Sequence, residues 1–248
     1  MLILAAVALY GIWTLATYLL ECRKKTFLKP PSSTDRLVYA VVANLLIGTL
    51  GSIMLIRWFA THSVPPWPGF ATQRVVLSVP AGLILGIVLL AIQRPATWNP
   101  TVLLNGYAQT LVVSIAEVLV CWGVLGAAVR FGTASLGTLS SIIIGLLVAS
   151  VAFGAYHFGH TAPFNTPPVV LGLSVVGLAT GLFFVVSGDI YGTIAFHNFF
   201  AVKGVTGSLS KQGLLDQFRR PQPALLAMAV VAVALLIIFD VLLVRSMR

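Results

Sequence analysis

Residues 107–129 read YAQTLVVSIAEVLVCWGVLGAAV, an apolar run with a single acidic residue, Glu117, near its middle. The run is long enough to cross a bilayer, whose hydrocarbon core takes about 20 residues of helix. A carboxylate at that depth is costly unless it is paired or used, so it marks a functional site by default. Two histidines, His157 and His197, lie inside or at the end of later apolar runs. The pattern predicts chemistry inside a membrane.

The composition excludes a soluble domain, because 58% of the residues are hydrophobic and 8% are charged, against about 25% charged in soluble proteins. We predict an all-α, polytopic membrane bundle of about eight transmembrane helices, forming one integral membrane domain over residues 1–248. Hydrophobic runs predict helices at residues 2–20, 37–60, 74–93, 105–129, 137–158, 168–187, 189–202 and 222–244. The seventh is short for a full span.

The net charge of +9 does not indicate a nucleic-acid partner, because the basic residues are confined to short loops between the apolar runs. Membrane orientation explains them better. With an external N-terminus, ten basic residues face the cytoplasm and five face outward, which favours both termini outside. The ten are Arg23, Lys24, Lys25, Lys29, Arg36, Arg94, Lys203, Lys211, Arg219 and Arg220. The first apolar run precedes this basic cluster, so we expect an anchor helix rather than a removable signal peptide.

Glu117 is the only deeply placed acid among six acidic residues. We expect the other five at helix ends or in loops: Glu21, Asp35, Asp189, Asp216 and Asp240. A buried carboxylate has a raised proton affinity, as a general base near neutral pH requires. His157 and His197 are suited to orienting a water against it and to stabilising an oxyanion. Each residue alone is equally consistent with interhelical packing, but three such groups in three helices favour a site.

A third histidine, His160, follows His157 by three residues and shares its face if the helix continues through Gly159. It is then a possible auxiliary group. Gly159 and Pro163 weaken a helix there, which favours an interfacial position for His160.

Three segments in order resemble the motifs of the CAAX-protease and bacteriocin-processing family of intramembrane glutamic proteases. Residues 117–123 (EVLVCWG) are similar to its Glu-Glu-x-x-x-Arg-Gly motif, and residues 153–157 (FGAYH) match Phe-x-x-x-His. Residues 188–197 (GDIYGTIAFH) resemble the helix that carries its last histidine. The resemblance covers residues 105–203, which are the expected protease-like core, with residues 1–104 as peripheral helices.

The motifs are incomplete. Val118 replaces the second glutamate, Trp122 the arginine, and Ala201 the asparagine four residues after the last histidine. Asn198 does not simply substitute, because one residue turns a helix by about 100° whereas four return nearly to the same face. Trp122 and Asn198 are nevertheless kept as possible auxiliary residues. Losing the glutamate and arginine together is electrostatically coherent, since losing one alone strands a buried charge.

The resemblance implies a metal-independent glutamic endopeptidase with Glu117, His157 and His197 as catalytic residues and no cofactor. Its expected partners are membrane lipid and a membrane-associated or lipidated protein or peptide, in a prokaryotic cell membrane. The incomplete motifs leave a second hypothesis open, an inactive relative that acts as an immunity, scaffold or regulatory protein. A third is metal-assisted chemistry on these residues with His160, because imidazole and carboxylate suit zinc or iron. The oligomeric state stays open.

Overall fold

The computed structural model describes residues 1–62, 70 and 72–245, and all regular structure in this part of the chain is helical. Helical segments that follow one another without a break form single long helices. The segments are α1 (Leu2–Thr17), η1 (Tyr18–Cys22), η2 (Thr26–Leu28), α2 (Thr34–Val38), η3 (Tyr39–Leu50), α3 (Gly51–Thr61), α4 (Thr72–Ile92), α5 (Pro100–Glu117), η4 (Val118–Gly126), α6 (Ala127–Gly132), η5 (Ala134–Leu136), α7 (Thr138–Tyr156), η6 (His157–Gly159), α8 (Pro167–Ser187), α9 (Ile190–Lys211), η7 (Leu215–Phe218), α10 (Pro223–Phe239) and η8 (Asp240–Val244).

The predicted all-α polytopic bundle is confirmed. Within the described residues, seven helices are long and apolar enough to cross a membrane. The eighth long helix, α9, is absent from that group, and it differs from its predicted bounds of 189–202. It continues to Lys211, because the polar residues after Lys203 include no proline and keep their backbone helical. The predicted end at residue 202 was too early, because it was set where the sequence becomes polar rather than where the helix ends.

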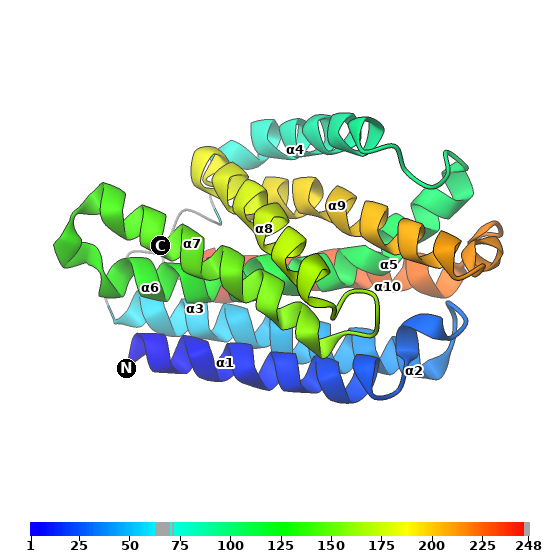
Figure 1. The fold of residues 1–248 in the computed structure, drawn as a ribbon. Coiled ribbons are helices and arrows are strands. Elements are labelled where there is room, and N and C mark those ends of the chain that lie inside the picture. The colour runs from blue at the N-terminus through cyan, green and yellow to red at the C-terminus, as the bar shows by residue number, and fades with distance from the viewer. Residues whose placement is uncertain (63–69, 71, 246–248) are drawn as a thin grey trace.

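Among the seven candidate membrane spans, the longest is α5–η4–α6 over residues 100–132. It is also the most buried, because 89% of its most apolar stretch lies inside the bundle. Its start is set by Asn99, whose side-chain oxygen accepts from the backbone N–H groups of Thr101 and Val102, with Pro100 at the first helical position. It runs through the middle of the bundle in Figure 1, with α9 above it and α1 and α3 below it. Glu117 is therefore carried on the central helix.

Glycines set close helix crossings around this centre. A Cβ at Gly82 in α4 would lie closer than 3.0 Å to the backbone of Gly192 in α9, so these two helices approach backbone to backbone. Gly177 and Gly181 lie in α8. A Cβ at Gly181 would lie closer than 3.0 Å to Trp122 on the central helix. The small residues bring α8 and α9 up to the centre.

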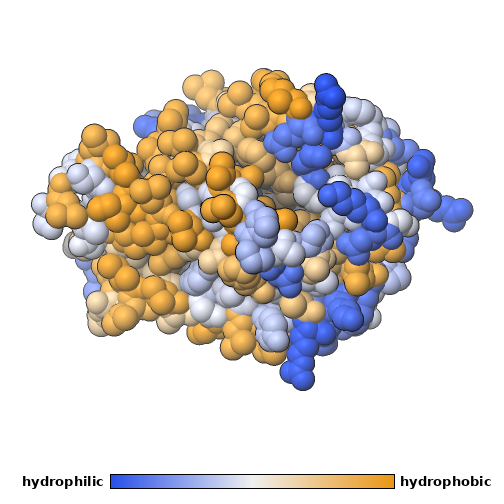
Figure 2. Space-filling view, in the orientation of Figure 1, coloured by the Kyte–Doolittle hydropathy of each residue, from blue (hydrophilic) through white to orange (hydrophobic). Residues whose placement is uncertain are grey.

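The surface matches a membrane-embedded bundle. Figure 2 shows hydrophobic residues over most of the visible face and hydrophilic ones concentrated at the right-hand end. In Figure 1 that end holds α2 and the last turns of α9, where Arg36 and Lys211 lie. The N-terminus lies toward the opposite end. That the basic end faces the cytoplasm stays a prediction.

Candidate active site

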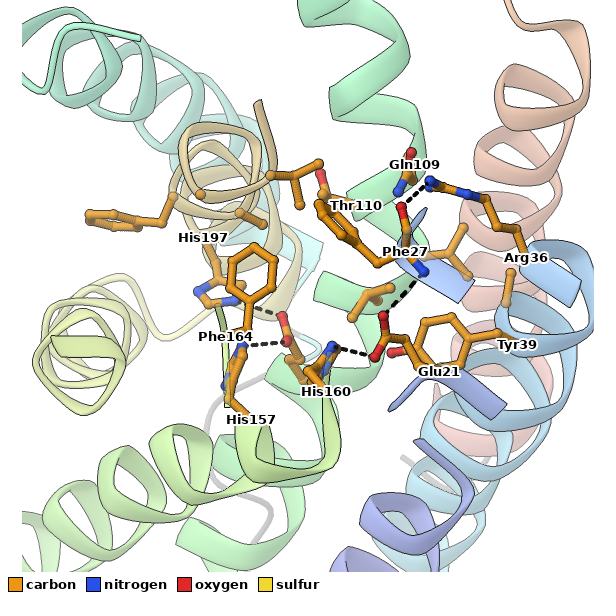
Figure 3. A pocket seen from close by; sticks show the side chains of 18 of the residues that line it. Glu21, Phe27, Arg36, Tyr39, Gln109, Thr110, His157, His160, Phe164 and His197 are labelled. Atoms are coloured by element: carbon orange, nitrogen blue, oxygen red, sulfur yellow. Dashed lines mark hydrogen bonds and ion pairs between the residues drawn. The ribbon is translucent and has the colours of Figure 1, made fainter. Parts of the chain in front are cut away.

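The last residue of α5, Glu117, is buried with 4% of its surface exposed. Its carboxylate faces histidines from two other helices, and Figure 3 shows these histidines, His157 and His197, among the residues around the cavity. The structure therefore brings together the three residues that were predicted as the site. Each lies 40 residues from the next in sequence. His157 directly follows α7 as the first residue of η6, and His197 is in the first half of α9.

His197 contacts Glu117 directly, with Nε2 3.0 Å from Oε2, and is 1% exposed. Its other ring nitrogen, Nδ1, lies 2.8 Å from the hydroxyl oxygen of Thr180 on α8. A neutral imidazole has one donor and one acceptor. Because the carboxylate is an acceptor, Nε2–H donates to Glu117 and the Thr180 hydroxyl donates to Nδ1. The carboxylate thus sets the nitrogen that carries the hydrogen, and Thr180 helps to fix the orientation of the ring.

His157 contacts the other carboxylate oxygen more loosely, with Nε2 3.7 Å from Oε1 of Glu117. Its Nδ1 donates to the backbone carbonyl of Phe153, one turn earlier, at 2.8 Å. That bond places the hydrogen on Nδ1 and leaves Nε2 with a lone pair toward Glu117. The Phe-x-x-x-His spacing thus has a local cause, since residues four apart in a helix lie one above the other.

The three residues line a cavity of about 270 Å³. Its wall is mainly apolar, with residues such as Phe27, Val112 and Leu173. Polar residues also line it, and two of them, Arg36 and Lys203, belong to the basic set predicted to face the cytoplasm. An apolar chamber with a few convergent polar groups is the usual form of a small-molecule or peptide site.

His160 lies at the same cavity, next to His157. The two imidazole rings stack with centroids 5.0 Å apart and planes at 22°. Burial, together with the neighbouring His157 ring, holds the pKa of His160 well below its ordinary value. The helix does not continue through Gly159 as a regular α-helix but tightens into η6 (His157–Gly159), yet both histidines still reach the site.

Two functional candidates were missed by sequence reasoning. Glu21, expected at a helix end, is 4% exposed and lines the cavity, with an oxygen 3.9 Å from Nδ1 of His160. Its one signal is spacing, because it follows Trp13 and Thr17 at intervals of four on the first helix. Thr180 carries no such signal, since a threonine within an apolar helix is ordinary.

The two auxiliary candidates on the central helix and on α9 do not line the cavity. Trp122 is 1% exposed, and its ring packs 5.8 Å from that of His197, centroid to centroid. Asn198 is fully buried, where it accepts from the Ser114 hydroxyl at 2.9 Å and donates to the Tyr107 carbonyl at 3.0 Å. Trp122 thus contacts His197 and Asn198 contacts α5, both from outside the cavity. Their position supports packing roles.

Glu117, His157 and His160 each present an oxygen or nitrogen within 4.8 Å of the other two. Such a set could hold a zinc or iron ion, because imidazole and carboxylate suit these metals. The Nδ1–H bond of His157 to a backbone carbonyl is also the usual support for a metal-binding imidazole. The same atoms, without a metal, surround a space where a water can be held between a base and an imidazole.

Residues 97–202 match the family model described as type II CAAX prenyl endopeptidase Rce1-like. The match includes all three predicted catalytic residues and ends one residue short of the expected core, 105–203. Comparison with curated proteins and with solved structures gives no match.

Proposed function

Residues 97–202 are a domain of the Rce1-like, CAAX-protease and bacteriocin-processing family, and on that premise we propose that the protein is a metal-independent intramembrane peptidase. Glu117 is its general base, with His157 and His197 as its partners. The observation that carries the proposal is the pairing of one buried carboxylate with two imidazoles of defined hydrogen placement. The His197 imidazole is hydrogen-bonded to the carboxylate, and the His157 imidazole lies slightly farther from it.

That gap fits a water molecule. The 3.7 Å between Oε1 of Glu117 and Nε2 of His157 is too long for a hydrogen bond, but one water can contact both atoms at about 2.8 Å. Both atoms are acceptors, so the two hydrogens of this water point at them. Its oxygen lone pairs are then directed away from both residues, toward a substrate in the cavity.

The reaction that follows is hydrolysis of a peptide bond. The water oxygen bonds to the scissile carbonyl carbon while Glu117 takes one water proton. The carbon–nitrogen bond then breaks, and Glu117 passes that proton to the leaving nitrogen. The products are a carboxylic acid and an amine, and Glu117 is again a carboxylate. His197, held by Thr180, keeps the carboxylate in place through its Nε2–H bond.

His157 acts first as an acceptor. An oxyanion needs a hydrogen-bond donor, and the bond from His157 Nδ1 to the Phe153 carbonyl leaves no hydrogen on Nε2 in the neutral ring. His157 therefore orients the water, and it supports the oxyanion only when a proton reaches Nε2. This refines the expected role, in which both histidines were assigned both tasks.

The substrate we propose is a membrane-associated or lipidated peptide, cut near the basic end of the bundle. The apolar wall of the cavity favours an apolar segment. Arg36 and Lys203 in the wall support a position of the cavity near the predicted cytoplasmic boundary. The peptide bond reaches Glu117 from that side.

The test compares new peptide termini, by mass spectrometry, in native membranes with the wild type or Glu117→Gln. The amide keeps the shape of the side chain and an oxygen for His197, but it removes the base. Asp240→Asn is the matched control, because Asp240 is a fully buried carboxylate that does not line the cavity. We expect termini with the wild type and the control that are absent with Glu117→Gln.

Identical termini in all three membranes would contradict proteolysis and support the second hypothesis, a partner-binding role without catalysis. Termini that Glu117→Gln retains but that disappear with His157→Phe would contradict the role given to Glu117. Activity that a chelator abolishes and zinc restores would contradict the metal-independent mechanism and favour the set of Glu117, His157 and His160.

A further inference from the structure

Both carboxylate oxygens of Glu21 accept hydrogen bonds from residues that lie outside the first helix. Thr161 donates to it from its backbone N–H at 2.6 Å and from its hydroxyl at 2.9 Å. The backbone N–H of Phe27 donates to its other oxygen at 3.3 Å. Both oxygens thus accept from a backbone N–H, which only donates. Glu21 joins the end of α1–η1 to the residue that follows His160.

The contact belongs to a stripe along the first helix. Trp13, Thr17 and Glu21 are spaced by four residues and lie on one face. Trp13 stacks on Tyr156 with ring centroids 3.7 Å apart, and the Thr17 hydroxyl donates to the Tyr156 hydroxyl at 3.2 Å. Tyr156 directly precedes His157. A helix outside the family-matched segment therefore contacts the chain on both sides of the catalytic histidine.

The carboxylate of Glu21 lies within ion-pair distance of the His160 ring. The ring Nδ1 lies 3.9 Å from a Glu21 oxygen, while the ring Nε2 is buried without a hydrogen-bond partner. A neutral ring carries its hydrogen on one nitrogen only. With the hydrogen on Nδ1, the N–H is attracted to the Glu21 carboxylate, although 3.9 Å is too long for a direct hydrogen bond. With the hydrogen on Nε2, a lone pair faces the carboxylate and a buried donor is left unpaired, which is the costlier arrangement.

We propose that Glu21 is a positioning residue for the hydrolysis: it holds His160 as the Nδ1–H tautomer and fixes the turn that carries His157. Glu21 acts through contacts that are short and fully buried. The His160 ring, kept in one orientation, then lies flat against that of His157. This limits rotation of the ring whose Nε2 must stay 3.7 Å from Glu117. The kinetic consequence rests on the proposed function, whereas the tautomer does not.

The first experiment determines the tautomer of His160 and does not depend on enzymatic activity. Protein labelled with [15N]histidine is purified in detergent micelles, and the long-range proton–nitrogen spectrum assigns each ring, with single His→Phe variants identifying the signals. We expect the Nδ1–H tautomer for His160 in the wild type. In Glu21→Gln we expect its signals to move and to show a mixture of forms, because the amide must turn its NH2 toward one of the backbone N–H donors.

His62 and His197 should not move in Glu21→Gln, because neither contacts Glu21. Asp240→Asn, a fully buried carboxylate outside the cavity, should leave all four rings unchanged. A wild-type His160 in the Nε2–H form would overturn the proposal, since Glu21 would then donate a proton to the ring rather than accept one. The His160 tautomer is measured on the wild-type protein, so this test remains valid even if Glu21→Gln folds poorly.

The second experiment measures kcat and KM on a peptide that spans a cleavage site found in the comparison of membranes. For Glu21→Gln we expect kcat to fall roughly tenfold to a hundredfold, as for other residues that orient a functional imidazole, with KM nearly unchanged. Glu21→Asp, which keeps the charge, should recover part of the loss. An unchanged kcat, or an equal loss in Asp240→Asn, would overturn the positioning role. If no variant cleaves any peptide, the proposed function fails while the tautomer result still decides the role of Glu21.

Discussion

Trp13 on the first helix and Tyr156 on α7 stack face to face, with their ring planes within 6° and their centroids 3.7 Å apart. Both side chains are fully buried. The Tyr156 hydroxyl also lies 3.1 Å from that of Tyr39. Residues that directly precede His157 are thus held by helices from the first quarter of the chain, so the expected division into a protease-like core and peripheral helices understates what the first helices do.

Removing the stack should lower stability and activity together. For Trp13→Ala we expect a loss of about 3 to 5 kcal/mol of unfolding free energy, as for other fully buried large-to-small changes, measured by thermal unfolding in detergent. Trp13→Phe keeps an aromatic face and should lose much less. As a control, Trp98→Ala changes an exposed tryptophan and should leave the melting temperature unchanged. A Trp13→Ala protein as stable as the wild type would show that the stack is dispensable.

Thr180 should matter to the reaction but little to the fold. Thr180→Val keeps the shape and removes the hydroxyl that donates to Nδ1 of His197 at 2.8 Å. Without this partner Nδ1 is a buried acceptor with no donor and the ring loses one of its two hydrogen bonds, so we expect kcat to fall about tenfold. Thr206→Val is the control, because its equally buried hydroxyl donates to the Val202 carbonyl and has no contact with the site. Equal rates for both variants would contradict the role of Thr180.

The residues of the candidate site could be predicted because rare polar groups within apolar runs are conspicuous. Glu117, His157 and His197 stand out in this way, and the structure brings all three together. Glu21 was missed because it precedes the basic loop that begins at Arg23, where an acid is normally solvated. Its burial depends on Thr161, which lies 140 residues later. Contacts between residues so far apart leave no periodic signal in the sequence.

The helix bounds show the same limit. Eight long helices were predicted and eight are present among the described residues, seven of them apolar enough to cross a membrane, because membrane spans need long apolar runs. The true end of α9 at Lys211 was missed, since hydropathy reports the environment of a segment rather than its backbone. Asp189 was expected at a helix end or in a loop, and it caps the start of α9, where its side chain accepts from the Gly192 N–H at 2.7 Å. A cap is local, and local chemistry is visible in a sequence.

Close packing of α8 makes a prediction about two glycines on the same helix. Gly181→Ala should destabilise the protein, because the new Cβ would lie closer than 3.0 Å to Trp122 and Leu146. Overpacking of this kind costs about 1 to 3 kcal/mol. At Gly172 nothing lies within 4 Å of an added Cβ, so Gly172→Ala should raise stability by up to about 1 kcal/mol through helix propensity. Melting temperatures in detergent test both, and the same sign for the two variants would contradict this packing.

Asn198 offers a test of structure against catalysis at a residue proposed as auxiliary. It is fully buried, it accepts from the Ser114 hydroxyl and donates to the Tyr107 carbonyl, and it does not line the cavity. Asn198→Ala leaves those two partners unpaired, so we expect a loss of about 1 to 3 kcal/mol of stability. The kcat of the folded fraction should change less than twofold, because no reacting atom loses a contact. Ser114→Ala, which removes only one of the two bonds, should cost less stability and the same negligible amount of activity. A large fall in kcat for Asn198→Ala at full stability would instead place Asn198 at the reacting atoms, where it would supply the donor that the neutral His157 lacks.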